Sequence, residues 1–260
     1  MYKRQGLDTR LVNEPIFGST RAPASGSGDS GSKLRVKLDA IVPELETALK
    51  KDRNIRLSAR DYDVRVIQRG QGLALEHVTG GLISEGVLDQ PMALSLLERL
   101  GEAQRVVGLT YPAQDFNVTL SVERVAQNSS ETASSFKEGE LLQISLTSDQ
   151  PAYLIALNVD VEGRLTILYP SRDADLAPAA RGQTVKAAVS TVEAPFGTEV
   201  LKVFAFREKP AGYDELLRTP QFVGQEAIRR FLSMVDGGPG GRAQTAEILF
   251  SQPTVTRRPQ

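Results

Sequence analysis

The chain has 260 residues, 40% of them apolar, which is enough to bury the core of one large domain or two modest ones. Its 31 basic and 32 acidic side chains almost cancel, and no Lys/Arg-rich run offsets this locally, so nucleic acid is not expected as a partner. The lack of Cys excludes thiolate catalysis, disulfides and Cys-ligated metal, but leaves the compartment open between cytoplasm and periplasm. No apolar run predicts a transmembrane segment and no pattern predicts a signal peptide.

Residues 1–32 are predicted to be the tail of an upstream region followed by a flexible linker. From residue 18 onward almost every side chain is small or polar, so burial cannot offset the entropy of ordering. Residues 28–31 spell Gly-Asp-Ser-Gly, the string around a trypsin-like serine nucleophile. A linker gives a nucleophile no fixed geometry, so coincidence is the favoured interpretation. We expect that Met1 is not the native start and that a catalytic domain is encoded upstream.

Residues 33–111 are predicted to form a small α/β module. A first helix, ending near Asn54, is predicted from apolar residues at helical spacing: Leu38, Val42, Leu45 and Leu49. Short alternating runs at residues 55–57, 64–66 and 73–75 predict strands. A second helix from Pro91 to Gly108 carries the stripe Leu96, Leu100, Ala103 and Val107. The only histidine, His77, is in phase with the last strand; a structural role is favoured, because one His does not make a metal site.

Residues 115–254 are predicted to form a larger β-sandwich-like domain with a late helix. Alternating or apolar runs predict strands at residues 117–125, 141–146, 152–159, 164–169, 184–189, 200–206 and 246–250. The run 200–206, VLKVFAF, is apolar on both faces, which favours a central strand. Residues 127–139 are predicted as a polar loop, and residues 228–235 as a helix. The overall fold class is therefore α+β.

Residues 141–170 predict a β-hairpin, with a polar turn at residues 147–151 and a further strand that folds straight back. Asn158, Asp160 and Gly163 form an Asn-x-Asp-x-x-Gly turn, and the next strand ends in Leu-Tyr-Pro at Tyr169 and Pro170. This pattern resembles an uncharacterised bacterial domain often found downstream of caspase-like peptidase or protein-kinase catalytic domains. The resemblance implies a β-rich domain with no assigned activity. Residues 33–111 resemble the small module that sometimes precedes it.

The same turn matches the first half of a calcium loop, with oxygen-bearing side chains at Asn158, Asp160 and Glu162 before Gly163. Tyr169 replaces the Glu of the twelfth position and the surroundings are strand-like, so a hairpin turn is favoured. A weak cation site that includes Asp173 and Asp175 stays open as an alternative. We therefore predict a ligand or turn site at Asn158, Asp160, Glu162 and Tyr169, and no catalytic residue, cofactor or metal.

Aromatic side chains on the strands are the other candidates for a ligand groove: Tyr153, Tyr169, Phe204 and Phe206. A role in the core is the favoured interpretation. These observations predict a non-catalytic accessory region that recognises a partner or ligand, within a larger bacterial caspase-like peptidase protein. Its expected partner is the upstream catalytic domain or another protein, and the oligomeric state is open. Two alternatives remain: a stand-alone extracytoplasmic envelope or surface-assembly protein, and a hydrolase that uses Asp160, Glu162 and Asp173.

Overall fold

The computed structural model describes residues 33–78, 81–84, 86–109, 111, 116–126, 129–193, 197–236 and 241–251. The predicted linker at residues 1–32, with its Gly-Asp-Ser-Gly string, lies outside these residues.

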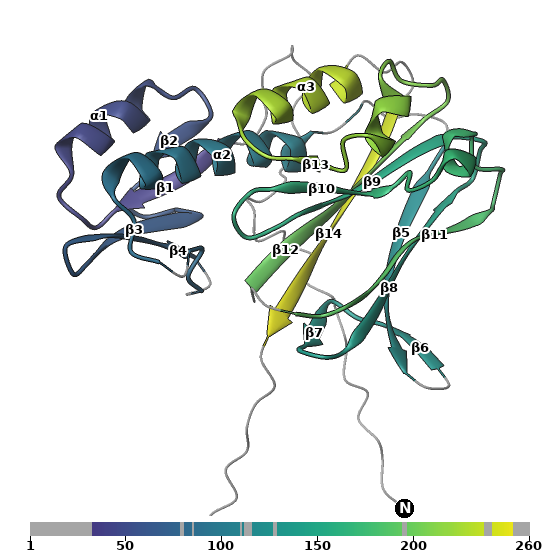
Figure 1. The fold of residues 1–260 in the computed structure, drawn as a ribbon, viewed down its shortest axis with the longest axis horizontal. Coiled ribbons are helices and arrows are strands. Elements are labelled where there is room, and N and C mark those ends of the chain that lie inside the picture. Colours follow the sequence, from purple (N-terminus) through teal and green to yellow (C-terminus); the bar gives the residue numbers. More distant parts are fainter. Residues whose placement is uncertain are drawn as a thin grey trace, which may run out of the picture.

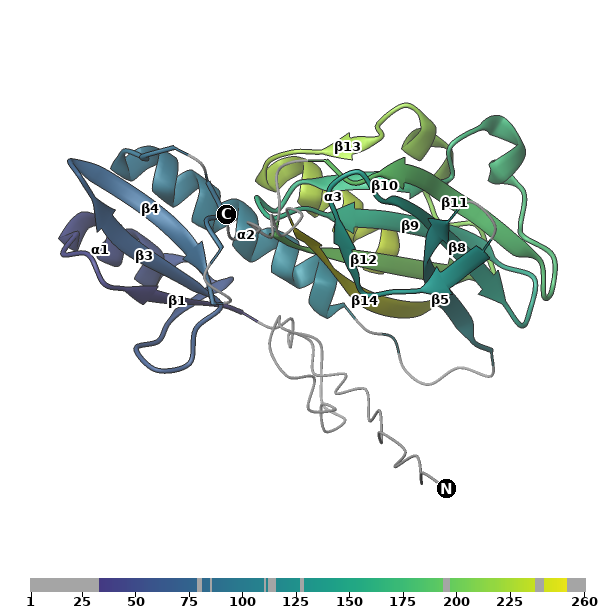
Figure 2. The same cartoon turned by 90° about the horizontal axis from the view of Figure 1, so that it is seen from below.

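The N-terminal module contains four strands and two helices: β1 (Leu34–Leu38), α1 (Pro43–Lys51), β2 (Ile55–Leu57), β3 (Val64–Arg69), β4 (Gly72–His77) and α2 (Gln90–Gly108). The strand order is β2-β1-β3-β4, in which β1 is parallel to both neighbours and β3 and β4 are antiparallel. Both helices lie on one face of this sheet (Figures 1 and 2). Their apolar sides share a buried cluster with the strands.

The first helix was predicted too long, because Leu38 is the last residue of β1, a strand that was not predicted. Leu34 and Val36 are fully buried and alternate with polar neighbours, which is the pattern of β1. The helix starts at Pro43, where the fixed φ of proline suits a first turn. Leu45 and Leu49 then face the core, as the spacing predicted.

The described residues of the second region form two sheets, one α-helix and two short 3-10 helices. Its elements are β5 (Val118–Ala126), β6 (Ser129–Thr132), β7 (Ser135–Lys137), β8 (Leu141–Ser148), β9 (Tyr153–Val159), β10 (Leu165–Tyr169), η1 (Asp173–Leu176), β11 (Thr184–Thr191), β12 (Gly197–Phe206), η2 (Tyr213–Leu217), β13 (Gln221–Phe222), α3 (Gln225–Asp236) and β14 (Gly241–Ser251). One sheet has the order β13-β10-β9-β12-β14-β7 and the other β11-β8-β5-β6. The described part of the chain is thus mostly β-sheet with three α-helices, which is compatible with the predicted α+β class.

Each face of the six-stranded sheet has its own buried cluster. On one face, Ala156 and Leu201 share a cluster with Leu142 and Ile144 of the four-stranded sheet. On the other face, Phe204 and its neighbours pack with residues of α2 and α3. As predicted, β12 is a central strand, since it pairs with β9 on one side and β14 on the other.

One prediction about strand pairing and one about a loop were wrong. β8 pairs with β5 and β11, whereas β9 pairs with β10 and β12, so residues 147–151 cross between sheets and do not close a hairpin. Turn residues specify a chain reversal but not which sheet the next strand joins. The hairpin between β9 and β10 is present as predicted. The predicted polar loop at residues 127–139 contains β6 and β7, two short strands at sheet edges, where polar residues are common.

Helix α2 belongs to both regions of the fold. Its first half contributes Ala93 and Leu97 to the cluster of the N-terminal module. Its second half contributes Ala103 and Val106 to the cluster beneath α3, and the fully buried Glu102 accepts from Arg229 of α3 at 2.9 Å. The domain boundaries at residues 33–111 and 115–254 stay predictions. α2 lies within the first range, but its side chains belong to two cores. Figure 1 shows α2 running from the N-terminal module toward the β-rich region.

Candidate functional site

The turn between β9 and β10 is closed by Asp160. One carboxylate oxygen, Oδ1, accepts from the backbone N–H groups of Glu162 and Arg164, both at 2.9 Å. The other oxygen accepts from Nε of Arg164 at 2.6 Å, and this hydrogen bond is the main cause of the raised pKa of Arg164. Gly163 completes the turn with a φ of 75°, a conformation that favours glycine. Asp160 is therefore bonded inside its own turn.

The tip of this turn docks on α2. Nε of Arg99 donates to the backbone carbonyl of Glu162 at 2.7 Å, and the Glu162 carboxylate lies 3.6 Å from Nη2 of Arg99. A Cβ on Gly163 would lie 3.2 Å from Cα of Leu100, which is closer than an ordinary van der Waals contact, so the turn packs tightly against the helix. The sequence feature that resembled a binding loop is thus a contact between the two regions of the fold.

Asn158 lies just before the turn and contacts a buried acid that sequence analysis missed. Its Nδ2 donates to Glu199 of β12, while its Oδ1 is buried and has no hydrogen-bond partner within the described part of the chain. Burial raises the pKa of Glu199 to about 7, against the opposing effect of the Asn158 hydrogen bond. The sequence feature that could have identified Glu199 is an acidic residue in a strand that is otherwise apolar on both faces.

Tyr169 and the aspartates after it lie at the other end of β10. Tyr169 is buried in the cluster between the sheets and pairs with Ala156, and burial raises its pKa. Asp175 accepts from the backbone N–H and the hydroxyl of Ser171, both at 3.1 Å. The calcium-loop residues are therefore not brought together with Asp173 and Asp175. Across the described residues, no group of three or more His, Asp or Glu side chains could hold a metal ion.

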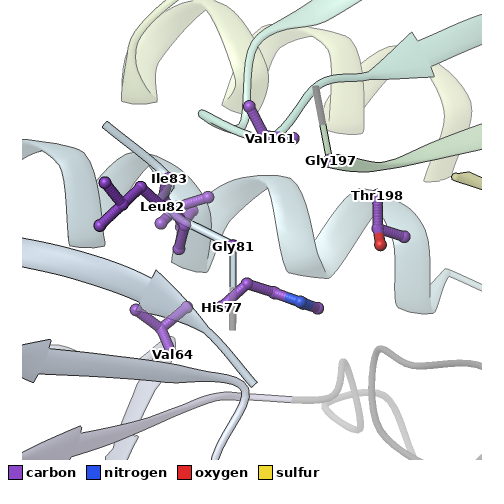
Figure 3. A pocket seen from close by; sticks show the side chains of 9 residues that line it. Val64, His77, Gly81, Leu82, Ile83, Val161, Gly197 and Thr198 are labelled. Carbon is purple, nitrogen blue, oxygen red and sulfur yellow. The ribbon is translucent and has the colours of Figure 1, made fainter. Parts of the chain in front are cut away.

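A small cavity of about 30 Å³ lies beside the docked turn (Figure 3). Val161 and Thr198 line it from the β-rich region, and Val64, His77 and Ile83 line it from the N-terminal module. Burial lowers the pKa of His77, and the negative charge of Asp63 acts in the opposite direction. The cavity has room for water but not for an organic ligand, which needs several hundred Å³.

A larger groove of about 240 Å³ opens between η2, β13 and α3. Three of its residues, Leu216, Phe222 and Phe231, are buried members of the cluster under α3. The rest of the lining consists of Ala211, Gly212, Glu215, Thr219, Arg230, Ser233 and Met234. None of the polar lining residues was predicted from the sequence, because single exposed side chains on a helix or short turn carry no pattern. The strand aromatics named as groove candidates do not line it, and Phe204 and Phe206 are fully buried.

A buried lysine, also missed from the sequence, holds α2 against the sheet. Lys202 is 2% exposed, and its Nζ donates to the carbonyl of Val107 in the last turn of α2 at 2.8 Å. A cation is favourable at this end of a helix dipole. Burial lowers the pKa of Lys202 to about 7.

Among the described residues no helix is long and apolar enough to cross a membrane.

Comparison with known proteins matches part of the chain to a family. No curated protein and no solved structure matches the chain. Residues 135–209 match a family described as "Domain of unknown function (DUF4384)". The matched residues include β9, β10 and the turn between them, whereas α2 and the groove lie outside them.

Proposed function

We propose that this chain is a non-catalytic accessory region that binds a partner or ligand within a larger bacterial caspase-like peptidase protein. The observation that carries the proposal is that the acidic side chains of the turn at residues 158–163 are bonded within the protein. The Asp160 carboxylate bonds backbone N–H groups and Arg164 within the turn. The Glu162 carboxylate pairs with Arg164 and with Arg99, at the contact between the two regions. These acids hold the fold together, which suits a binding scaffold better than a hydrolase that would need them free.

Two further observations support a binding role. α2 joins both cores, so the two regions can present their surfaces in a fixed relation to a neighbouring domain. The groove at α3 offers a recess with an apolar base and polar side chains, the usual character of a ligand site. We also propose that the two sheets form a β-sandwich, which the cluster that they share supports.

The absence of catalysis is tested with the purified chain. Assays against peptide, ester and phosphate substrates should show only background turnover. The matched variant is Asp160→Asn, which changes the acid that the hydrolase alternative would use. Turnover by the wild-type chain that this variant loses would contradict the proposal.

The caspase-like context is tested separately, by reading the DNA upstream of Met1. An in-frame extension that encodes a His and a downstream Cys on strand ends supports it, because a cysteine nucleophile needs an activating base. A stop codon directly upstream of a ribosome-binding site and Met1 would contradict it. If the extension exists, deleting this region from the full protein should change peptidase activity or its response to ligand.

A further inference from the structure

The groove between η2, β13 and α3 combines an apolar base with two charged side chains on opposite sides, Arg230 on α3 and Glu215 on η2. We propose that it binds a small carboxylic acid, with the apolar body on the phenylalanines and the carboxylate at Arg230. The inference rests on the proposed binding function and names the ligand class of that function.

The base of the groove suits a compact apolar group. The rings of Phe222 and Phe231 are 5.3 Å apart and inclined by 60°, and Leu216 completes the buried base. Met234 forms part of the wall, and its flexible thioether can adapt to different shapes. The volume of about 240 Å³ is below the roughly 300–1,000 Å³ of sites for drug-sized molecules, which limits the ligand to a small one.

The positive charge at the groove comes from one arginine of an adjacent pair. Arg229 is already bound, since it donates to Glu102 and Gln225 at 2.9 Å. Arg230 lines the groove and makes no side-chain hydrogen bond or ion pair with the described residues. A guanidinium can bind a carboxylate through two parallel hydrogen bonds. Arg230 is therefore the cation available to a ligand.

The position of the ligand follows from the other polar groups in the lining. Ser233 lies one helical turn after Arg230 on α3 and can add a hydroxyl donor. Glu215 lies on η2, and its carboxylate would repel an anion. The carboxylate of the ligand consequently lies on the α3 side of the groove, away from η2.

The experiment is an NMR titration of the isotope-labelled chain with three probes at millimolar concentration. Phenylacetate carries both features of the proposed ligand, phenylacetamide is its neutral isostere, and acetate carries the charge alone. Phenylacetate should shift the backbone signals of η2, β13 and α3, and phenylacetamide should bind about fivefold more weakly, as expected for loss of one partly exposed ion pair. Acetate should cause no shift. Equal affinity for the acid and the amide, or shifts elsewhere in the chain, would overturn the proposal.

Variants place the site within the groove. Arg230→Gln should reduce the affinity for phenylacetate to that for phenylacetamide, and Ser233→Trp should abolish binding by filling the groove. Glu215→Gln should strengthen it, by removing repulsion. The matched control is Ser190→Trp on β11, an exposed site outside the groove, which should change nothing.

Other results with these variants, or with a peptide probe, would contradict the proposed ligand class. Unchanged affinity in Ser233→Trp, or weaker binding in Glu215→Gln, would overturn the proposal. Tighter binding of a blocked peptide with an internal Phe than of phenylacetate would also overturn it, and would make a protein segment the occupant. None of these results affects the assays of catalysis and of the upstream reading frame, so failure of the ligand class is distinguishable from failure of the accessory role.

Discussion

The turn at residues 158–163 and the groove beside α3 differ in how they look in the sequence and in what their side chains can do. The turn has a recognisable pattern of polar residues, yet Asp160 and Glu162 are occupied by contacts within the protein. The groove has no sequence pattern, yet it leaves Arg230 available next to an apolar base. A pattern of polar residues therefore indicates a fixed backbone geometry here, while the proposed binding groove consists of single side chains that the fold brings together.

The largest expected effect is the loss of stability when a core residue is truncated, compared with a substitution in the groove. Phe204 is fully buried among the aromatic residues under α3, so Phe204→Ala should lower the free energy of unfolding by about 3–5 kcal/mol. Ser233 is exposed on α3, so Ser233→Trp should change it by no more than about 0.5 kcal/mol. Chemical denaturation measures both. A small loss for Phe204→Ala would place that ring at a surface and restore it as a groove candidate.

Gly163 tests whether the turn is packed against α2. Gly163→Ala should lower the free energy of unfolding by about 2–3 kcal/mol, because the new Cβ adds a clash with Leu100 to the strain of a left-handed backbone. The matched control is Gly182→Ala: Gly182 has a similar φ of 69° but nothing within 4 Å of the added Cβ, so only the strain, about 1 kcal/mol, should remain. Equal losses at the two positions would mean that the turn does not press on the helix.

Glu199 should make the stability of the protein depend on pH. Burial raises its pKa from 4.5 to about 7, so between these values the folded protein holds a proton that the unfolded chain has released. Stability should therefore be fully present below about pH 4.5 and fall as the pH rises to 7, by on the order of 2 kcal/mol. Denaturation from pH 4 to 8 should show this fall in the wild type and lose it in Glu199→Gln. The same slope in both proteins would assign it to other groups.

The ion pair at the tip of the turn should have the smallest effect. Arg99 and Glu162 are partly exposed, so a double-mutant cycle with Arg99→Gln and Glu162→Gln should give a coupling energy of about 0.5–1 kcal/mol. A coupling near zero would mean that the Glu162 carboxylate adds nothing to the hydrogen bond from Arg99 to the Glu162 carbonyl and to the close approach of Gly163 to Leu100.

The success of the sequence predictions depended on how local each signal was. The helix residues Leu45 and Leu49, the central strand β12 and the β9–β10 turn were predicted, because periodicity and turn chemistry act over a few residues. The partner of β8 and the edge strands β6 and β7 were not, because pairing is decided by distant segments. For the same reason the roles of Glu199, Lys202 and Arg230 were not predicted, because these roles depend on neighbours that the fold supplies.

The central claim, that α2 and the turn join the two regions into one unit, is tested most directly by hydrogen exchange under increasing denaturant. Mass spectrometry would follow peptides from β3 and β4 of the N-terminal module and from β9 and β12 of the β-rich region. Because α2 contributes to both cores, both sets of peptides should lose protection at the same denaturant concentration, and Gly163→Ala should shift them together. Two separate midpoints in the wild-type protein would contradict the account.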